Sequence, residues 1–215
     1  MNAELLSLFT ASFVTFFVLI DALGVAPVFA TLTARGNAAY RRNMAVKSSF
    51  VATIIMFSFA FGGAWLMNAM QISIDAFRAA GGALLFLIAL DMVFEKRTER
   101  REHRAEEHIG SHLKDPAPDD ISVFPIGIPM IAGPGSIATA MFYMSSAHNW
   151  AEKGVILLAI GLNLLLTLVI FLAAGPLVRL LGASVAGAMT RIFGVILAAL
   201  SVQLLIDGIK GAFGL

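Results

Sequence analysis

The sequence contains no cysteine, so disulfide bonds, thiolate metal sites and cysteine nucleophiles are excluded. Charged residues are also scarce, because Asp, Glu, Lys and Arg make up only 13% of the chain, against roughly 25% in soluble domains. Hydrophobic residues instead account for 59% of the 215 residues, and the mean hydropathy is +0.86. The composition therefore excludes an ordinary soluble enzyme and predicts a membrane protein.

Six apolar runs are long enough to cross a bilayer as helices, which takes roughly 20 residues each. They lie at about Leu5 to Thr33, Met44 to Met67, Phe77 to Phe94, Ile121 to Ser145, Gly154 to Leu181 and Ala188 to Ile209. No basic residues precede the first run, so it is interpreted as a span and not as a signal peptide. The sequence predicts an all-α membrane protein with six transmembrane helices.

Lys and Arg are distributed unevenly among the predicted loops. Twelve of them fall in the connections after spans one, three and five, and three fall on the opposite side. Because cytoplasmic loops carry the excess of positive charge, both termini are predicted on the non-cytoplasmic side. The net charge of +1 gives no indication of nucleic-acid binding, since these residues flank apolar spans.

The six spans divide into two halves, residues 1–94 and 121–215, joined by a charged linker at 95–120 that is predicted to be cytoplasmic. Because each half has an odd number of spans, the second half must enter the membrane inverted relative to the first. Six identities occur at an offset of 113: Ala60, Gly62, Arg78, Gly81, Leu84 and Leu87 match Ala173, Gly175, Arg191, Gly194, Leu197 and Leu200. We therefore expect two inverted-topology three-helix repeats, as in many secondary transporters.

Spans one and four contain residues that interrupt helices. Span one contains Asp21, Gly24 and Pro27. Span four contains Pro129, Gly133, Pro134, Gly135 and Ser136. Proline removes a backbone donor and glycine permits non-helical conformations, so both spans are predicted to be broken. Free backbone groups are costly in hydrocarbon, and the breaks should therefore line a central polar site. A kink that serves only packing is the alternative interpretation.

The break in span four predicts an anion site. A half-helix that begins at Pro134 presents free N–H groups and the positive end of its dipole, which attract a carboxylate. Gly135 and Ser136 are the candidates for this cradle. The backbone N–H groups are expected to bind the anion, and Ser136 could either cap the half-helix or accept a hydrogen bond from the substrate.

Asp21 is the most costly residue to place in the membrane, since a carboxylate near the bilayer centre costs at least roughly 2.5 kcal/mol. We expect it to bind a coupling Na⁺ or H⁺ or a substrate ammonium, and capping of the broken helix is the alternative. Asn163 in span five and Gln203 in span six are predicted to line the same site. Interhelical hydrogen bonding is the competing interpretation for these two residues.

At these residues the sequence resembles the MarC family of integral membrane proteins, which includes small neutral amino acid transporters and is related to the lysine-exporter superfamily. The resemblance covers nearly the whole chain. It depends on the D-x-x-G-x-x-P run that starts at Asp21, on IPMIAGPGSIATAM, on RAAGGALLFLIALDMVF and on RIFGVILAALSVQLLIDGIKG. It implies a bacterial inner membrane and transport of glycine, alanine or similar solutes. The family usually has Asp-Pro where this chain has Asp21 and Ala22, so the first break is expected to be milder.

The leading functional hypothesis is alternating-access transport of a small amino acid. A small-solute channel and a non-transporting membrane subunit are the alternatives. An enzyme is not expected, because the spans contain no His, no HExxH motif and no paired carboxylates. No cofactor is expected beyond the coupling ion, and His108 and His112 in the linker are not predicted to form a metal site. The expected partners are a small-molecule substrate, the lipid bilayer and a second copy of the chain in a homodimer.

Overall fold

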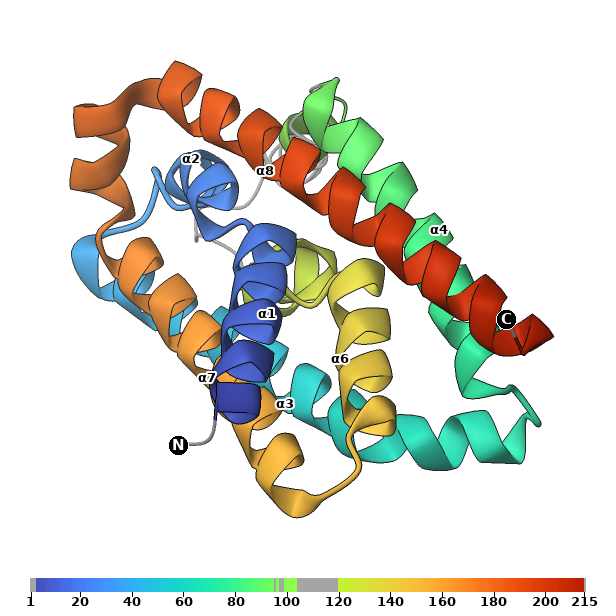
Figure 1. Cartoon of the computed structure of the whole chain (residues 1–215). Coiled ribbons are helices and arrows are strands. Elements are labelled where there is room, and N and C mark those ends of the chain that lie inside the picture. Colours follow the sequence, from blue (N-terminus) through green and yellow to red (C-terminus); the bar gives the residue numbers. More distant parts are fainter. Residues whose placement is uncertain (1–2, 95, 97–98, 104–119, 215) are drawn as a thin grey trace.

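The structure is a computed structural model that describes residues 3–94, 96, 99–103 and 120–214. Across these residues the chain consists of helices and short turns, with no strand among them (Figure 1). The prediction of an all-α fold is therefore confirmed. The linker histidines His108 and His112, and most of the predicted linker at 95–120, lie outside the described residues.

The first half contains four helices. They are α1 (Ala3–Ile20), α2 (Ala22–Leu32), α3 (Ala38–Ala69) and α4 (Ile74–Val93). Short polar side chains define where the two long helices begin. Asn37 accepts a hydrogen bond from Tyr40 N at the start of α3, and Ser73 accepts one from Ala76 N at the start of α4.

The second half begins with an irregular helical segment. Its elements are η1 (Ser122–Ile131), α6 (Pro134–Ser146), α7 (Trp150–Leu172) and α8 (Ala174–Phe213). Phe124 and Ile128 have extended backbone within η1, because each precedes a proline whose ring disfavours the helical conformation of its neighbour. η1 and α6 are bent by 58° relative to each other.

Span five ends earlier than the apolar run to Leu181 predicts. α7 ends at Leu172, and the following residues already belong to α8. Pro176 lies in the first turn of α8. Backbone N–H groups in a first turn have no acceptor within the helix, so proline loses no hydrogen bond there. A second interruption follows at Gly182, whose φ of 73° is readily adopted only by glycine.

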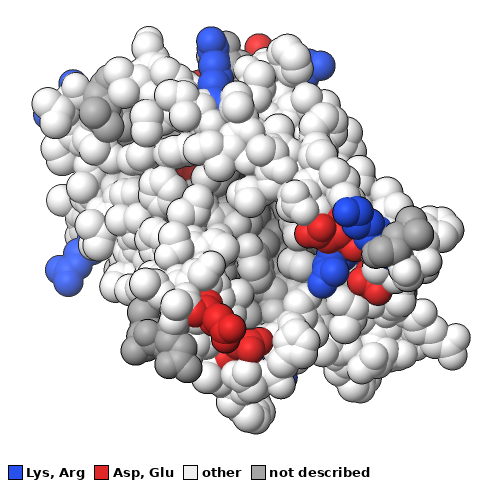
Figure 2. Space-filling view, in the orientation of Figure 1, with Lys and Arg blue, Asp and Glu red and all other residues white. Residues whose placement is uncertain are grey.

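The helices are suited to a bilayer in length and surface. Five helices in the described part of the chain are long and apolar enough to cross a membrane, or six if the bent pair of η1 and α6 counts as one span. Large side chains such as Phe50, Trp65, Leu87 and Leu180 are exposed. Figure 2 shows a face on which charged side chains form a few small clusters and most of the surface carries no charge.

Close packing between the halves encloses the end of α1. α4 and α8 run side by side (Figure 1), and glycines allow their close approach. A Cβ on Gly82 would lie 2.6 Å from the backbone nitrogen of Leu205 in α8. Leu19 of α1 packs with Leu85 of α4 and Leu197 of α8 in a buried cluster. Asp21, which follows the last residue of α1, is therefore buried deep in the protein.

Candidate functional site

Asp21 separates α1 from α2. Its φ of 50° and ψ of 52° are left-handed, a conformation that Asp adopts more readily than most residues with a side chain. The helical hydrogen bonds continue on both sides, since Asp21 N donates to Phe17 O and Val25 N donates to Asp21 O. Asp21 Oδ1 also accepts a hydrogen bond from Gly24 N at 3.2 Å. The carboxylate thus caps α2 at an interruption of a single residue.

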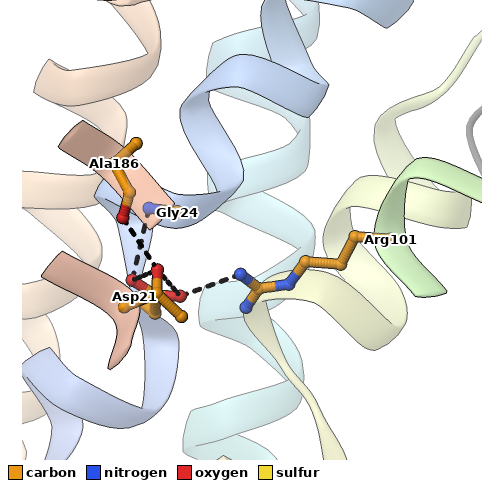
Figure 3. Close-up of polar contacts among 5 residues, drawn as sticks. Asp21, Gly24, Arg101 and Ala186 are labelled. Carbon is orange, nitrogen blue, oxygen red and sulfur yellow. Dashed lines mark hydrogen bonds and ion pairs between the residues drawn. The ribbon is translucent and has the colours of Figure 1, made fainter. Parts of the chain in front are cut away.

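The same carboxylate forms a buried ion pair. Arg101 Nη1 donates to Asp21 Oδ2 at 2.9 Å, and the two residues are 3% and 1% exposed (Figure 3). Thr190 of α8 lies within hydrogen-bond distance of both carboxylate oxygens, at 3.1 and 3.3 Å, and also of Ala186 O. Buried charges persist when they are paired and hydrogen-bonded. Asp21 has both kinds of partner.

A pocket of about 350 Å³ lies beside this ion pair, near the lower end of the range of roughly 300–1,000 Å³ for ligand sites. Its apolar wall is formed by Leu19, Leu84, Leu87, Ile88 and Met130. Its polar and charged lining consists of Asp91, Arg100, Arg101 and Ser136. The remaining lining residues are Pro129, Gly133, Pro134 and Gly135, which lie at or near the bent junction of η1 and α6. The pocket can therefore hold a small solute with one apolar and one polar side.

The N-terminus of α6 faces this pocket without a side-chain cap. Gly133 is the N-cap residue and its backbone is extended. Pro134 has no N–H, and the N–H groups of Gly135 and Ser136 belong to the first turn, where a helix offers no internal acceptor. A Cβ on Gly135 would lie 2.5 Å from Ile88 Cδ1, so the end of the Ile88 side chain would have to move to admit it. This end of α6 presents donors and a partial positive charge.

Arg101, which lines the pocket, also carries an unpaired donor. Its Nη2 atom is buried and has no hydrogen-bond partner in the part of the chain that the structure describes. Arg100, the preceding residue, pairs with Asp91 at the partly exposed edge of the pocket. Among the described residues, the charges at the pocket are thus Arg100 and Arg101 with their carboxylate partners Asp91 and Asp21.

The other predicted site residues lie elsewhere. Pro27 is inside α2 and is not part of the pocket lining. Asn163 is buried, and its Nδ2 donates to Phe13 O of α1 and to Ala159 O of its own helix, so it forms an interhelical hydrogen bond. Gln203 is exposed on α8 and donates to Asp207. The structure brings together Asp21, Gly24, Pro129, Gly133, Pro134, Gly135 and Ser136, but not these three residues.

Sequence reasoning missed four polar residues of this site. Arg100 and Arg101 lie in a run of mixed charges that resembles a solvated linker, and Thr190 and Asp91 lie within otherwise apolar spans. One signal was available, since a carboxylate within a membrane needs a partner of opposite charge. This rule predicts a basic residue beside Asp21, but it does not say which Lys or Arg of the linker that residue is.

Comparisons with known proteins agree with the resemblance seen in the sequence. The family described as "MarC family integral membrane protein" matches residues 6–213. The chain is 36% identical to UPF0056 membrane protein MJ1677 of Methanocaldococcus jannaschii, over 96% of this chain and 98% of that protein. It is 31% identical to UPF0056 membrane protein YhcE of Escherichia coli, over 94% and 91%, and 32% identical to UPF0056 membrane protein YvbG of Bacillus subtilis, over 94% and 93%. No solved structure matches the chain.

Proposed function

The chain belongs to the MarC family of integral membrane proteins, and we propose that it is a secondary transporter of small neutral amino acids such as glycine and alanine. One observation carries the proposal. The buried pair of Asp21 and Arg101 lies at a helix interruption, beside a small pocket that also receives the uncapped N-terminus of α6. Charged groups inside a membrane protein are costly and typically mark the path of a solute or ion.

The chemistry of the pocket supports a zwitterion. Donors from α6 and Arg101 suit a carboxylate. Asp91 is the acidic residue of the pocket lining that suits an ammonium group, because the oxygens of Asp21 are already engaged by Arg101, Thr190 and Gly24. The apolar wall suits a small aliphatic side chain.

The arrangement of helices supports two inverted three-helix repeats and alternating access. α1 packs against α7 of the other half, as α6 packs against α3, and α4 pairs with α8. If the two halves are exchanged, the contact of α1 with α7 becomes that of α6 with α3, and the contact of α4 with α8 maps onto itself. In transporters of this design, one repeat moves against the other around a central site formed by broken helices.

Orientation and coupling complete the proposal. Both termini lie outside the cytoplasm, and the pocket beside the C-terminal part of α4 is reached from the cytoplasmic side. Asp21 is the coupling residue, at which a H⁺ or Na⁺ competes with Arg101 for the carboxylate. Replacement by Asn removes the charge, and transport by Asp21→Asn should lose its dependence on the gradient of the coupling ion.

The deciding experiment is counterflow of labelled alanine and glycine in proteoliposomes that contain the purified protein. The wild-type protein should show saturable exchange. Ser136→Ala removes a hydroxyl from the pocket and should weaken the apparent affinity by about fivefold to tenfold, the effect of one hydrogen bond. Ser145→Ala is the matched control on the same helix, since the Ser145 hydroxyl donates to Phe142 O at the opposite end of α6.

Two results would contradict the transporter proposal. Flux that does not saturate and shows no counterflow would indicate a channel. No flux of either amino acid by the purified protein, in a preparation that remains folded, would favour a membrane subunit that does not itself transport. Equal losses in Ser136→Ala and Ser145→Ala would remove the pocket from the transport path.

A further inference from the structure

The guanidinium group of Arg101 is only half engaged. Nη1 donates to Asp21 Oδ2 at 2.9 Å, whereas Nη2 is buried without a hydrogen-bond partner among residues 3–94, 96, 99–103 and 120–214. The side chain is only 4% exposed. A buried donor on a charged group is costly to leave unpaired, and native proteins nearly always supply an acceptor. Because Arg101 lines the pocket, a ligand bound there is the candidate source of this acceptor.

A second set of donors lines the same pocket. Gly135 and Ser136 contribute first-turn N–H groups of α6, which has no side-chain cap. Guanidinium and backbone N–H groups only donate hydrogen bonds. The occupant must therefore present several acceptor atoms close together. A carboxylate satisfies this requirement, because its two oxygens can receive the guanidinium and the helix terminus at once.

The charge around the pocket limits the ligand further. Arg101 is balanced by Asp21 and Arg100 by Asp91, so the described lining is neutral overall. A ligand with a net charge would leave that charge uncompensated in a site of low polarity, which is costly. A zwitterion adds no net charge. The carboxylate is thus expected as part of a molecule that also carries a positive group.

We infer that Arg101 binds the carboxylate of the transported solute through Nη2 while Nη1 stays on Asp21. Asp21 is then a positioning residue, which fixes the guanidinium so that one nitrogen points to the protein and the other to the ligand. This inference rests on the proposed function and deepens it, because it assigns carboxylate recognition to a residue of the segment after α4. The N-terminus of α6 supplements Arg101 in this role.

The test compares binding of alanine and alaninamide to purified protein in nanodiscs by titration calorimetry. Alaninamide replaces the carboxylate by an amide and keeps the rest of the molecule. The wild-type protein should bind alanine on the order of tenfold to a hundredfold more tightly, the effect of one hydrogen bond between charged groups. Arg101→Gln should abolish this preference. Arg78→Gln is the matched control, since Arg78 pairs with Asp75 at the start of α4, outside the pocket lining.

Arg101→Gln alone leaves the Asp21 carboxylate buried without its cation, and this variant could fail to fold. The double variant Asp21→Asn with Arg101→Gln removes both charges together and keeps the site neutral. It should fold and bind alanine and alaninamide with similar affinity. Asp21→Asn alone should bind alanine more weakly but retain the preference for the carboxylate, because Arg101 is still present. A merely structural role of Asp21 would leave the affinity of the folded protein unchanged.

The possible results separate this inference from the proposed function. Loss of the preference in the double variant, with Arg78→Gln unchanged, supports the assignment. A double variant that still prefers alanine to alaninamide overturns it. A wild-type protein that binds neither alanine nor glycine, or one that binds alaninamide as tightly as alanine, also overturns it. Intact carboxylate preference without counterflow in proteoliposomes would contradict the transport proposal only. Counterflow without any carboxylate preference would contradict only the role of Arg101.

Discussion

Replacing one member of the Asp21–Arg101 pair should destabilise the protein more than replacing both. Both side chains are almost fully buried, at 0% and 4% exposure, and their charged atoms lie 2.9 Å apart. At an effective dielectric constant of about 20, two unit charges at this distance attract by about 6 kcal/mol. Desolvation of the two ions costs several kcal/mol each and offsets most of this attraction. The pair as a whole therefore contributes little net stability, but a single remaining charge is costly.

The expected magnitudes follow from this balance. Asp21→Asn leaves the Arg101 guanidinium uncompensated, and Arg101→Gln leaves the Asp21 carboxylate uncompensated. Each single variant should lose about 3–5 kcal/mol of unfolding free energy. In the double variant the side-chain amide introduced by Asp21→Asn can still accept the hydrogen bond from Gly24 N, and no buried charge remains. Its loss should be smaller than that of either single variant by at least about 1 kcal/mol.

Thermal and denaturant unfolding in detergent would measure the stabilities of the two single variants and the double variant. Lys47→Gln is the control, because Lys47 and Asp120 form a pair whose side chains are 47% and 52% exposed. Hydrogen bonds from Ser122 and Lys47 hold the pKa of Asp120 at about 2, so this control pair is also ionised at neutral pH. Its loss should cost only about 0–1 kcal/mol. Single and double variants whose losses simply add would refute the reasoning, since additivity means that the charges do not interact.

Three further predictions concern packing, the carboxylate and topology. Gly82→Ala should destabilise the protein by about 1–3 kcal/mol, because the added Cβ would lie 2.6 Å from a backbone nitrogen of α8. Gly81→Ala is the control: a Cβ there would meet nothing within 4 Å, so this variant should be neutral or stabilising in the same unfolding assay. Thr190→Val removes a donor from a buried carboxylate at nearly constant volume and should lower the unfolding free energy by about 1–2 kcal/mol; an unchanged value would exclude this hydrogen bond. The chain has no cysteine, so a single exposed Ala151→Cys should react with an impermeant thiol reagent added outside intact cells, and Ala39→Cys only after permeabilisation; the reverse pattern would invert the proposed orientation.

The sequence predicts those features of the fold that depend on local chemistry. Apolar runs of sufficient length specify the long helices, and the all-α fold follows from them. Proline determines its neighbour's backbone directly, which is why Phe124 and Ile128 are extended in η1. Hydropathy alone could not locate the end of α7, because the residues on both sides of Ala173 are equally apolar. Pro176 was the local signal for that boundary.

The candidate site was only partly predictable, because its charges come from distant parts of the chain. The turn at Pro134 and the cost of Asp21 are visible locally, but the partner of Asp21 is 80 residues away, in a segment that reads as a solvated linker. Asn163 and Gln203 were predicted to line the site, but they do not. Polar side chains in spans form hydrogen bonds with any nearby acceptor, and these two do so at an interhelical contact and on an exposed helix face.

Asp21 accounts for how the first span is interrupted although Ala22, and not a proline, follows it. Ala22 has a backbone N–H and is a good helix former, so position 22 gives no covalent reason for a break. The side chain of Asp21 provides one instead: Oδ1 caps Gly24 N, and Oδ2 is held by Arg101 across the pocket wall. The left-handed residue is thus stabilised by the contacts of its own carboxylate. In the proposed coupling role, an ion that competes for this carboxylate would act on the backbone conformation at the junction of α1 and α2, and ion binding would thereby be coupled to the geometry of the first span.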